Sequence, residues 1–220
     1  MTLDDLIAQA RLRAQDTVAP YLWSNAEWMA YANEAQREAC RRARLIVDSS
    51  TAAICTITVD GVSPTFELDP RVLFIRRAKP SWSSVPLKRI GYQDLDKQAP
   101  GWEDETSASP AWYVPDMDEN KFRPYPTPSV SGTVKLTVVR LPLEDMGLSD
   151  EPEIKPQFHD SLLYWMLHKA YAKQDSEVTD KKLSMDNLAL FEQEFGKKSS
   201  AIDETWLQRE ANYTESEGNY

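Results

Sequence analysis

The chain is poor in the residues and segments that mark several large classes of protein. Its two cysteines, Cys40 and Cys55, are too few for a disulfide framework and fit a reducing compartment, where we expect two buried thiols. No apolar run approaches the roughly 18 residues of a membrane-spanning helix. The acidic start MTLDDLIAQA lacks the basic and apolar regions of a signal peptide. These absences predict a soluble protein made in a cytoplasm, with no membrane partner.

An excess of positive charge is also missing. The net charge is −10, and residues 143–220 hold nearly all of it, with 8 basic and 17 acidic side chains. Residues 50–142 hold 11 of each sign, and residues 1–49 hold 6 basic and 7 acidic. A protein that grips DNA by its phosphates normally carries the opposite charge. We therefore expect no sequence-specific DNA binding, and an acidic surface past which DNA slides without sticking.

Recognisable catalytic motifs are absent as well. The chain has no G-x-S-x-G, no Walker loop and no G-x-G-x-x-G. No pair of carboxylates stands in the apolar context that would raise one pKa for acid catalysis. The sequence therefore predicts that the protein is not an enzyme, has no catalytic residue and binds no cofactor.

Two patterns could suggest a metal site, and neither is complete. The two histidines, His159 and His168, are nine residues apart and would face opposite sides of one helix. Residues 116–120 (DMDEN) begin like a calcium-binding loop, but Lys121 replaces the turn glycine and Thr127 stands at the closing glutamate position. We therefore predict no metal site.

Four segments carry the spacing of amphipathic helices. They are residues 2–15, 24–47, 157–173 and 179–200. The first two open with capping pairs, Thr2 with Asp5 and Ser24 with Glu27. Gly196 is a stop signal for the last one.

The segment 24–47 carries two stripes. Its apolar stripe is mostly alanine, which would let a partner helix approach closely. The members are Trp28, Ala32, Ala35, Ala39, Ala43 and Ile46. A second stripe, the arginine row, has Arg37, Arg41 and Arg44 at positions i, i+4 and i+7. The row is either a solvated face or a docking surface for an acidic partner.

Between the second and third helices the period of the pattern changes to two. Residues 51–59 alternate like a strand, and Asp60-Gly61 is a hairpin turn signal. Residues 72–75 and 133–142 read as further strands. Strands joined by proline turns predict a small sandwich or an open barrel.

The intervening stretch 76–130 is irregular and rich in proline, and it holds Trp82, Trp102 and Trp112. The three rings could form a stacking platform for a sugar or single-stranded nucleic acid. Alternatively, they cover the small β core beneath long loops. Each lies beside a proline or a turn rather than at regular strand spacing, which favours the covering role.

Together the segments predict an α+β fold, a helical bundle formed by N- and C-terminal segments with an inserted small β-sandwich or open barrel. The expected parts are a first helical part (1–49), a β-rich insertion (50–142), a second helical part (143–202) and a C-terminal docking tail (203–220). The tail places aromatic side chains in an acidic context and could bury little by itself.

The order of segments resembles the head-to-tail adaptor proteins of tailed bacteriophages, also called connector, gateway or head-completion proteins. The resemblance covers nearly the whole chain, although Ser109 precedes Pro110 without the glycine expected in that loop. The matching stretches are LIAQARLRAQD (6–16), YANEAQREACRRA (31–43), LDPRVLFIRRA (68–78), PGWEDETSASPAWYVPD (100–116), FRPYPTPSVSGTVKLTVVRLP (122–142), IKPQFHDSLLYWMLHKAYAKQDSEVTD (154–180) and LFEQEF (190–195).

The resemblance implies a non-catalytic virion protein at the head-tail junction. It implies a homo-oligomeric ring, usually of about twelve copies, docked beneath the portal protein and extending the DNA channel. The other implied partner is a downstream neck or tail protein, such as a nozzle or tube. We expect the tail to dock on the portal or an adjacent copy, because a few buried aromatics can dominate an interface. The anchor candidates are Trp206, Arg209, Tyr213 and Tyr220.

Two other functions remain open at this point. A carbohydrate- or peptide-binding β module on a helical stalk would be a monomer with a small-ligand site and a dispensable tail. A DNA-binding protein is disfavoured by the charge, and it would show salt-dependent retention of DNA.

Overall fold

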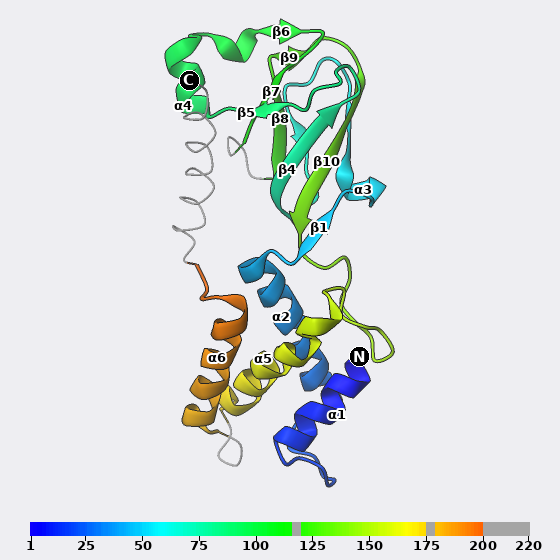
Figure 1. Ribbon diagram of the computed structural model, residues 1–220, viewed down its shortest axis with the longest axis vertical. Coiled ribbons are helices and arrows are strands. Elements are labelled where there is room, and N and C mark those ends of the chain that lie inside the picture. The colour runs from blue at the N-terminus through cyan, green and yellow to red at the C-terminus, as the bar shows by residue number, and fades with distance from the viewer. Residues whose placement is uncertain (116–119, 175–178, 200–220) are drawn as a thin grey trace. The chain divides into compact units, whose positions relative to one another are not determined.

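The computed structural model describes residues 1–115, 120–174 and 179–199. The chain separates into two compact units (Figure 1). The helical unit consists of residues 1–46 and 141–198, and the β unit of residues 47–140. The helical unit is therefore assembled from two sequence segments that the β unit separates. The α+β class predicted from the sequence is confirmed.

The described residues of the helical unit form four long helices. They are α1 (Leu3–Arg13), α2 (Asn25–Ala43), α5 (His159–Ala172) and α6 (Lys181–Phe195), with a short 3₁₀ turn (Pro156–Phe158) before α5. Both predicted capping boxes are confirmed, Thr2 with Asp5 and Ser24 with Glu27. In each box the side-chain oxygens accept hydrogen bonds from backbone N–H groups that the first helical turn leaves unpaired.

The predicted alanine stripe forms the part of α2 that lies in the core. Trp28, Ala32, Ala35 and Ala39 are fully buried, beside the buried Leu162, Leu163 and Met166 of α5. Small side chains at these positions let the two helices approach closely. Ala43, however, is exposed, because α2 ends there and the stripe does not continue.

The prediction that the helix runs to residue 47 was wrong. Arg44 adopts a left-handed conformation with φ of 52° and caps α2. Residues Ile46–Asp48 then form strand β1. The apolar Leu45, Ile46 and Val47 continued the helical spacing in the sequence, but β-branched side chains fit a strand at least as well.

The last helix pairs with α5 through aromatic side chains. Phe191 is fully buried, and its ring centroid lies 5.0 Å from that of Trp165 and 4.7 Å from that of Phe195. Gly196 ends α6 with φ of +86°, which confirms the predicted stop. An L side chain rarely adopts this backbone conformation, so glycine suits the position.

The β unit is organised around one long strand. Strand β10 (Gly132–Arg140) pairs antiparallel with β4 (Val72–Pro80) and β2 (Thr56–Val59), and also pairs with β1. A second sheet has the order β3 (Phe66–Glu67), β8 (Lys121–Tyr125), β7 (Trp112–Val114) and β5 (Lys88–Arg89). Strands β6 (Thr106–Ser107) and β9 (Thr127–Pro128) form a two-stranded parallel sheet. In the described part of the unit, no sheet closes into a barrel.

Short helices occupy the connections of the β unit. Helix α3 (Ala52–Cys55) precedes β2, so the first half of the predicted strand 51–59 is helical. Helix α4 (Tyr92–Gln98) and a 3₁₀ turn (Trp102–Asp104) lie between β5 and β6. Their buried Leu95 and Trp102 pack in a small core with Val114 and Tyr125.

The predicted hairpin at Asp60-Gly61 was wrong, because β2 pairs with the distant β10 and not with the next strand. The Asp60 carboxylate instead closes a local turn, accepting hydrogen bonds from the Val62 and Ser63 amides and the Ser63 hydroxyl. These hydrogen bonds lower the pKa of Asp60 to about 2, and the one from the Ser63 hydroxyl has the largest effect. Gly61 has φ of +79°, and a Cβ there would lie 2.7 Å from the Val130 carbonyl carbon. Glycine is needed for this close approach.

A buried ion pair ties the two ends of the β unit together. Arg140 Nε donates to Asp48 Oδ2 at 2.7 Å, and both side chains are 5% exposed. The Asp48 carboxylate also accepts hydrogen bonds from the Ser50 amide and hydroxyl and from the Thr51 amide. Burial by itself would raise the pKa of Asp48, but the hydrogen bonds from Thr51, Ser50 and Arg140 outweigh it and hold the pKa well below its usual value.

Candidate interaction surfaces

The arginine row does not continue along one helix as the sequence predicted. Arg37 and Arg41 lie exposed on α2, whereas Arg44 lies one residue beyond the helix. Arg37 forms an exposed ion pair with Asp145, and Arg41 pairs with Glu38 at 3.1 Å. The role of the row at an interface therefore stays a proposal. The tail candidates Trp206, Arg209, Tyr213 and Tyr220 lie outside the described residues.

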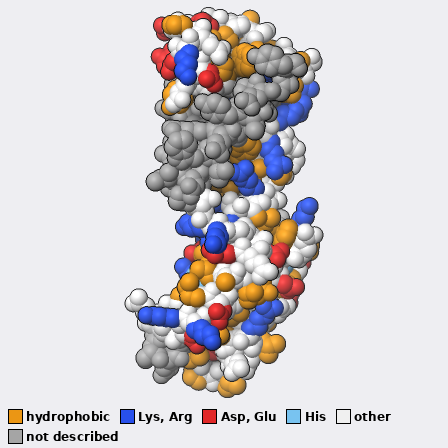
Figure 2. All heavy atoms as spheres, turned by 60° about the vertical axis from the view of Figure 1, so that its left-hand side comes forward, with side chains coloured by type: hydrophobic (Ala, Val, Ile, Leu, Met, Phe, Trp, Pro, Cys, Tyr) orange, Lys and Arg blue, Asp and Glu red, His pale blue; other side chains and the backbone are white. Residues whose placement is uncertain are grey.

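A second surface of the helical unit was not predicted from the sequence. Four large hydrophobic side chains are exposed at the end of α1 and in the loop before α2: Leu12, Val18, Tyr21 and Leu22. On the part of the helical unit visible in Figure 2, hydrophobic side chains lie among both Lys/Arg and Asp/Glu. No single sign of charge covers that face.

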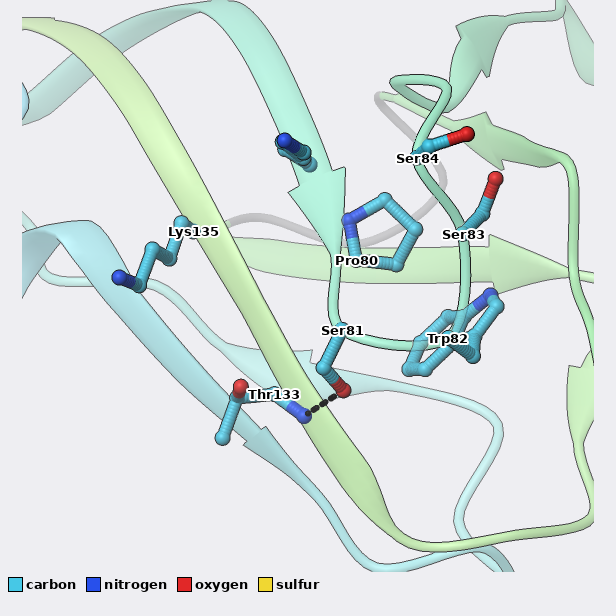
Figure 3. A pocket seen from close by; sticks show the side chains of 8 residues that line it. Pro80, Ser81, Trp82, Ser83, Ser84, Thr133 and Lys135 are labelled. Carbon is cyan, nitrogen blue, oxygen red and sulfur yellow. Dashed lines mark hydrogen bonds between the residues drawn. The ribbon is translucent and has the colours of Figure 1, made fainter.

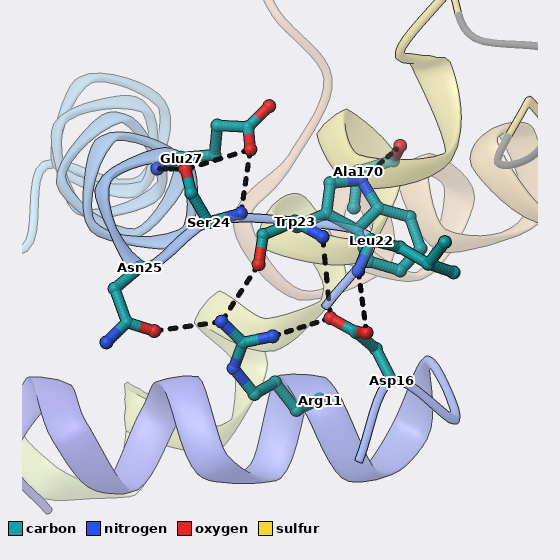
Figure 4. Close-up of polar contacts among 8 residues, drawn as sticks. All are labelled: Arg11, Asp16, Leu22, Trp23, Ser24, Asn25, Glu27 and Ala170. Carbon is teal, nitrogen blue, oxygen red and sulfur yellow. Dashed lines mark hydrogen bonds and ion pairs between the residues drawn. The ribbon is translucent and has the colours of Figure 1, made fainter. Parts of the chain in front are cut away.

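A buried polar network holds this loop (Figure 4). Arg11 Nη1 donates to Asp16 Oδ2 at 2.5 Å, and Arg11 Nη2 donates to the Trp23 carbonyl at 2.9 Å and to Asn25 Oδ1 at 2.8 Å. Asp16 Oδ1 accepts from the Leu22 amide at 2.8 Å. The network therefore joins the end of α1 to the start of α2. Sequence reasoning missed it because neither residue belongs to a motif that marks burial.

A third surface is the outer face of the β4–β10–β2 sheet. Residues Ala78 and Leu136 are buried opposite each other on the inner face, so alternate residues point outward. No carboxylate stands at the outward positions, which carry three cations and four threonines. They are Arg77, Lys79, Lys135, Thr56, Thr58, Thr133 and Thr137. We call this set the basic face. None of its cations forms a salt bridge with another residue in the described ranges.

The register of the basic face places two lysines directly opposite each other. Lys135 of β10 pairs with Lys79 of β4 on one side and with Thr56 of β2 on the other. Like charges directly opposite in a sheet are destabilising. The alternation of each strand is visible in the sequence, but the cross-strand register is not, so this face could not be predicted.

Lys79→Glu is expected to raise the free energy of unfolding of the β unit by about 0.2–1 kcal/mol, because the new carboxylate would face Lys135 across the strands. Hydrogen exchange of the β4 and β10 amides would measure the change. In the double variant K79E/K135E two carboxylates face each other, and the gain should disappear. A loss of stability in the single variant would contradict the assigned register.

A hollow of about 460 Å³ adjoins the basic face (Figure 3). It is lined by Lys79–Ser84, Thr133 and Lys135. The Ser81 hydroxyl accepts a hydrogen bond from the Thr133 amide at 3.0 Å, and Trp82 Nε1 donates to the Pro110 carbonyl at 3.0 Å. A Cβ on Gly132 would lie 2.8 Å from Ser81 Oγ, so the glycine allows the 81–84 loop to lie against β10.

The three tryptophans do not form one platform. Trp102 is 3% exposed, its Nε1 donates to Asp96, and its ring packs edge-on against Tyr125. Trp112 is half-buried against the same small core, with Lys88 Nζ 5.4 Å from its ring centroid. Trp102 and Trp112 therefore cover the β core, as the favoured interpretation predicted, and Trp82 borders the hollow.

The histidines have separate structural surroundings. His159 is 1% exposed and contacts the Ile154 carbonyl through Nε2, whereas His168 Nδ1 lies 3.0 Å from both the Ser184 carbonyl and the Ser184 hydroxyl. Across the residues that the structure describes, no group of three His, Cys, Asp or Glu side chains could hold a metal ion. The calcium-like start at Asp116 and Asp118 lies outside those residues.

The two cysteines are both buried free thiols, which confirms the prediction. Burial, with Asp48 nearby, raises the pKa of the Cys55 thiol, so the protonated form is favoured. None of the helices in the described part of the chain has the length and apolar character that a membrane crossing requires.

The described surfaces thus include both charged and apolar faces. No curated protein matches the chain. A family model described as SU10 adaptor protein matches residues 1–216, which is nearly the entire sequence and spans both units. The chain belongs to the SU10 adaptor protein family, a family of phage head-to-tail adaptors.

Proposed function

We propose that this phage adaptor forms a homo-oligomeric ring of about twelve copies beneath the portal protein. In that position it extends the DNA channel and provides a platform for the next neck or tail protein, while DNA passes without sequence-specific binding. The family match over residues 1–216 carries the proposal. The protein would act at the head-tail junction of the virion, after synthesis in the host cytoplasm, and without catalysis.

Two interfaces are part of this proposal. The tail, residues 203–220, is proposed to dock on the portal or on an adjacent copy through Trp206, Arg209, Tyr213 and Tyr220. The exposed Arg37, Arg41 and Arg44 are proposed to face another subunit. The division into 1–49, 50–142, 143–202 and 203–220 assigns the helical parts to the ring body and the last part to docking.

Electron microscopy of the purified chain mixed with the portal ring of the same source tests the function. The expected result is a second ring stacked on the portal, in which the copies can be counted directly. A variant lacking 203–220 serves as the comparison, and it should keep its circular dichroism spectrum but fail to attach. A chain that stays monomeric beside the portal would contradict the proposal and favour a carbohydrate- or peptide-binding module.

A further inference from the structure

We propose that the basic face of one copy binds the acidic tail, residues 203–220, of a second copy. This inference rests on the proposed ring, and it identifies a receiving surface on the chain itself. The contact would place the tail across Arg77, Lys79 and Lys135, with an aromatic side chain of the tail in the adjoining hollow beside Trp82.

The basic face has the charge and the hydrogen-bond donors that suit binding to an acidic segment. Lys79 and Lys135 are held directly opposite each other although like charges repel, and no described carboxylate forms a salt bridge with either of them. The neighbouring outward side chains of the same strands are threonines, whose hydroxyls can donate hydrogen bonds to carboxylates. In a chain with a net charge of −10, a carboxylate-free basic face is a local exception.

The tail has the complementary chemistry. It carries one basic residue, Arg209, and five acidic ones, for a net charge of −4. The acidic residues are Asp203, Glu204, Glu210, Glu215 and Glu217. Its aromatic residues are Trp206, Tyr213 and Tyr220, and the hollow offers the ring of Trp82 and the aliphatic stems of two lysines as an apolar wall.

The symmetry of a ring favours a second copy as the source of the tail. A ring of identical chains needs a head-to-tail interface, in which one chain contributes both complementary surfaces. A basic face and an acidic tail on the same chain meet that requirement. A tail bound to the β unit of its own chain would neutralise both surfaces without linking one copy to the next.

Three full-length variants separate these possibilities. The face variant is K79E/K135E, and the tail variant replaces the five tail acids by their amides. The charge control, K181E/K182E, makes the same net change as the face variant at two exposed positions of α6. Circular dichroism and thermal melting would establish that each variant is folded.

The first measurement is fluorescence anisotropy of a labelled peptide of residues 203–220 titrated with the tail variant, whose face is open. We expect saturable binding that weakens with salt. Adding the face substitutions to the tail variant should weaken binding at least tenfold, whereas adding the control substitutions should change it less than twofold. No binding, or equal losses from both pairs, would overturn the inference.

Sedimentation velocity of mixed variants then distinguishes a second copy from the same chain. The face variant retains a native tail, and the tail variant retains a native face, so each alone should remain monomeric and the mixture should form one-to-one pairs. A mixture that stays monomeric well above the dissociation constant of the peptide would overturn the inference.

The portal experiment separates this inference from the proposed function. If the face variant still formed a ring on the portal, only this inference would be contradicted. If the peptide bound as expected but the native chain formed no ring on the portal, only the proposed function would be contradicted.

Discussion

Asp48→Ala is expected to lower the free energy of unfolding of the β unit by about 3–5 kcal/mol at pH 7, because it removes one partner of the buried ion pair between Asp48 and Arg140. Hydrogen exchange of the β10 amides would measure the change within that unit. Asp145→Ala removes a carboxylate from the exposed pair with Arg37 in the helical unit, and hydrogen exchange of the α2 amides should show a cost of less than about 1 kcal/mol. Equal effects in the two variants would contradict the assigned burial.

The effect of Asp48→Ala should also depend on pH. The pKa of Asp48 is lowered in the folded protein, so the carboxylate stabilises the fold above its unfolded pKa of about 3.9. This stability is lost as the pH falls through the lower, folded pKa. The difference between native protein and variant should therefore be largest near neutral pH and narrow below about pH 4. A difference that widens on acidification would show that Asp48 is not held ionised.

Arg11→Met is expected to have an effect of similar size in the helical unit, about 3–5 kcal/mol, because the Asp16 carboxylate would stay buried without its cation. The substitution also removes the donors to the Trp23 carbonyl and Asn25 that join α1 to α2. Hydrogen exchange of the α1 amides and faster proteolysis in the 14–24 loop would report the loss.

Two comparisons decide whether that loss comes from an unpaired charge. Arg13→Met removes an exposed arginine from the same helix and should change stability by about 0.5 kcal/mol or less. The double variant R11M/D16N removes both charges, and it should be more stable than R11M alone. If the double variant were less stable than R11M, the loss would have to come from packing.

The helices were predicted well because their evidence is local. Capping pairs, apolar spacing and a stop glycine act within a few residues, so the sequence identified α1, α5 and α6 closely. The end of α2 was misplaced because residues 45–47 satisfy both a helical and an extended pattern. There the pairing of β1 with β10 decides the outcome, and that contact is not local.

The β unit and its surfaces were harder to predict for the same reason. Asp60-Gly61 has the composition of a hairpin, but β2 finds its partner more than seventy residues further along the chain. The basic face requires both the outward phase of each strand and the register that brings Lys79 opposite Lys135. The Arg11–Asp16 network requires the loop to fold back on α1. Sequence spacing contains neither kind of information.

The ion pair between Asp48 and Arg140 has a consequence for how such a chain could have evolved. The pair holds the start and the end of residues 47–140 next to each other. In the sequence of the helical unit, this stretch is therefore a closed loop between residues 46 and 141. The entropic cost of a loop grows slowly with its length, by only about 0.6 kcal/mol per doubling. A different module with equally close ends could replace this one while the helical unit kept its own packing. The surface of residues 47–140 could thus change in sequence separately from the helical unit.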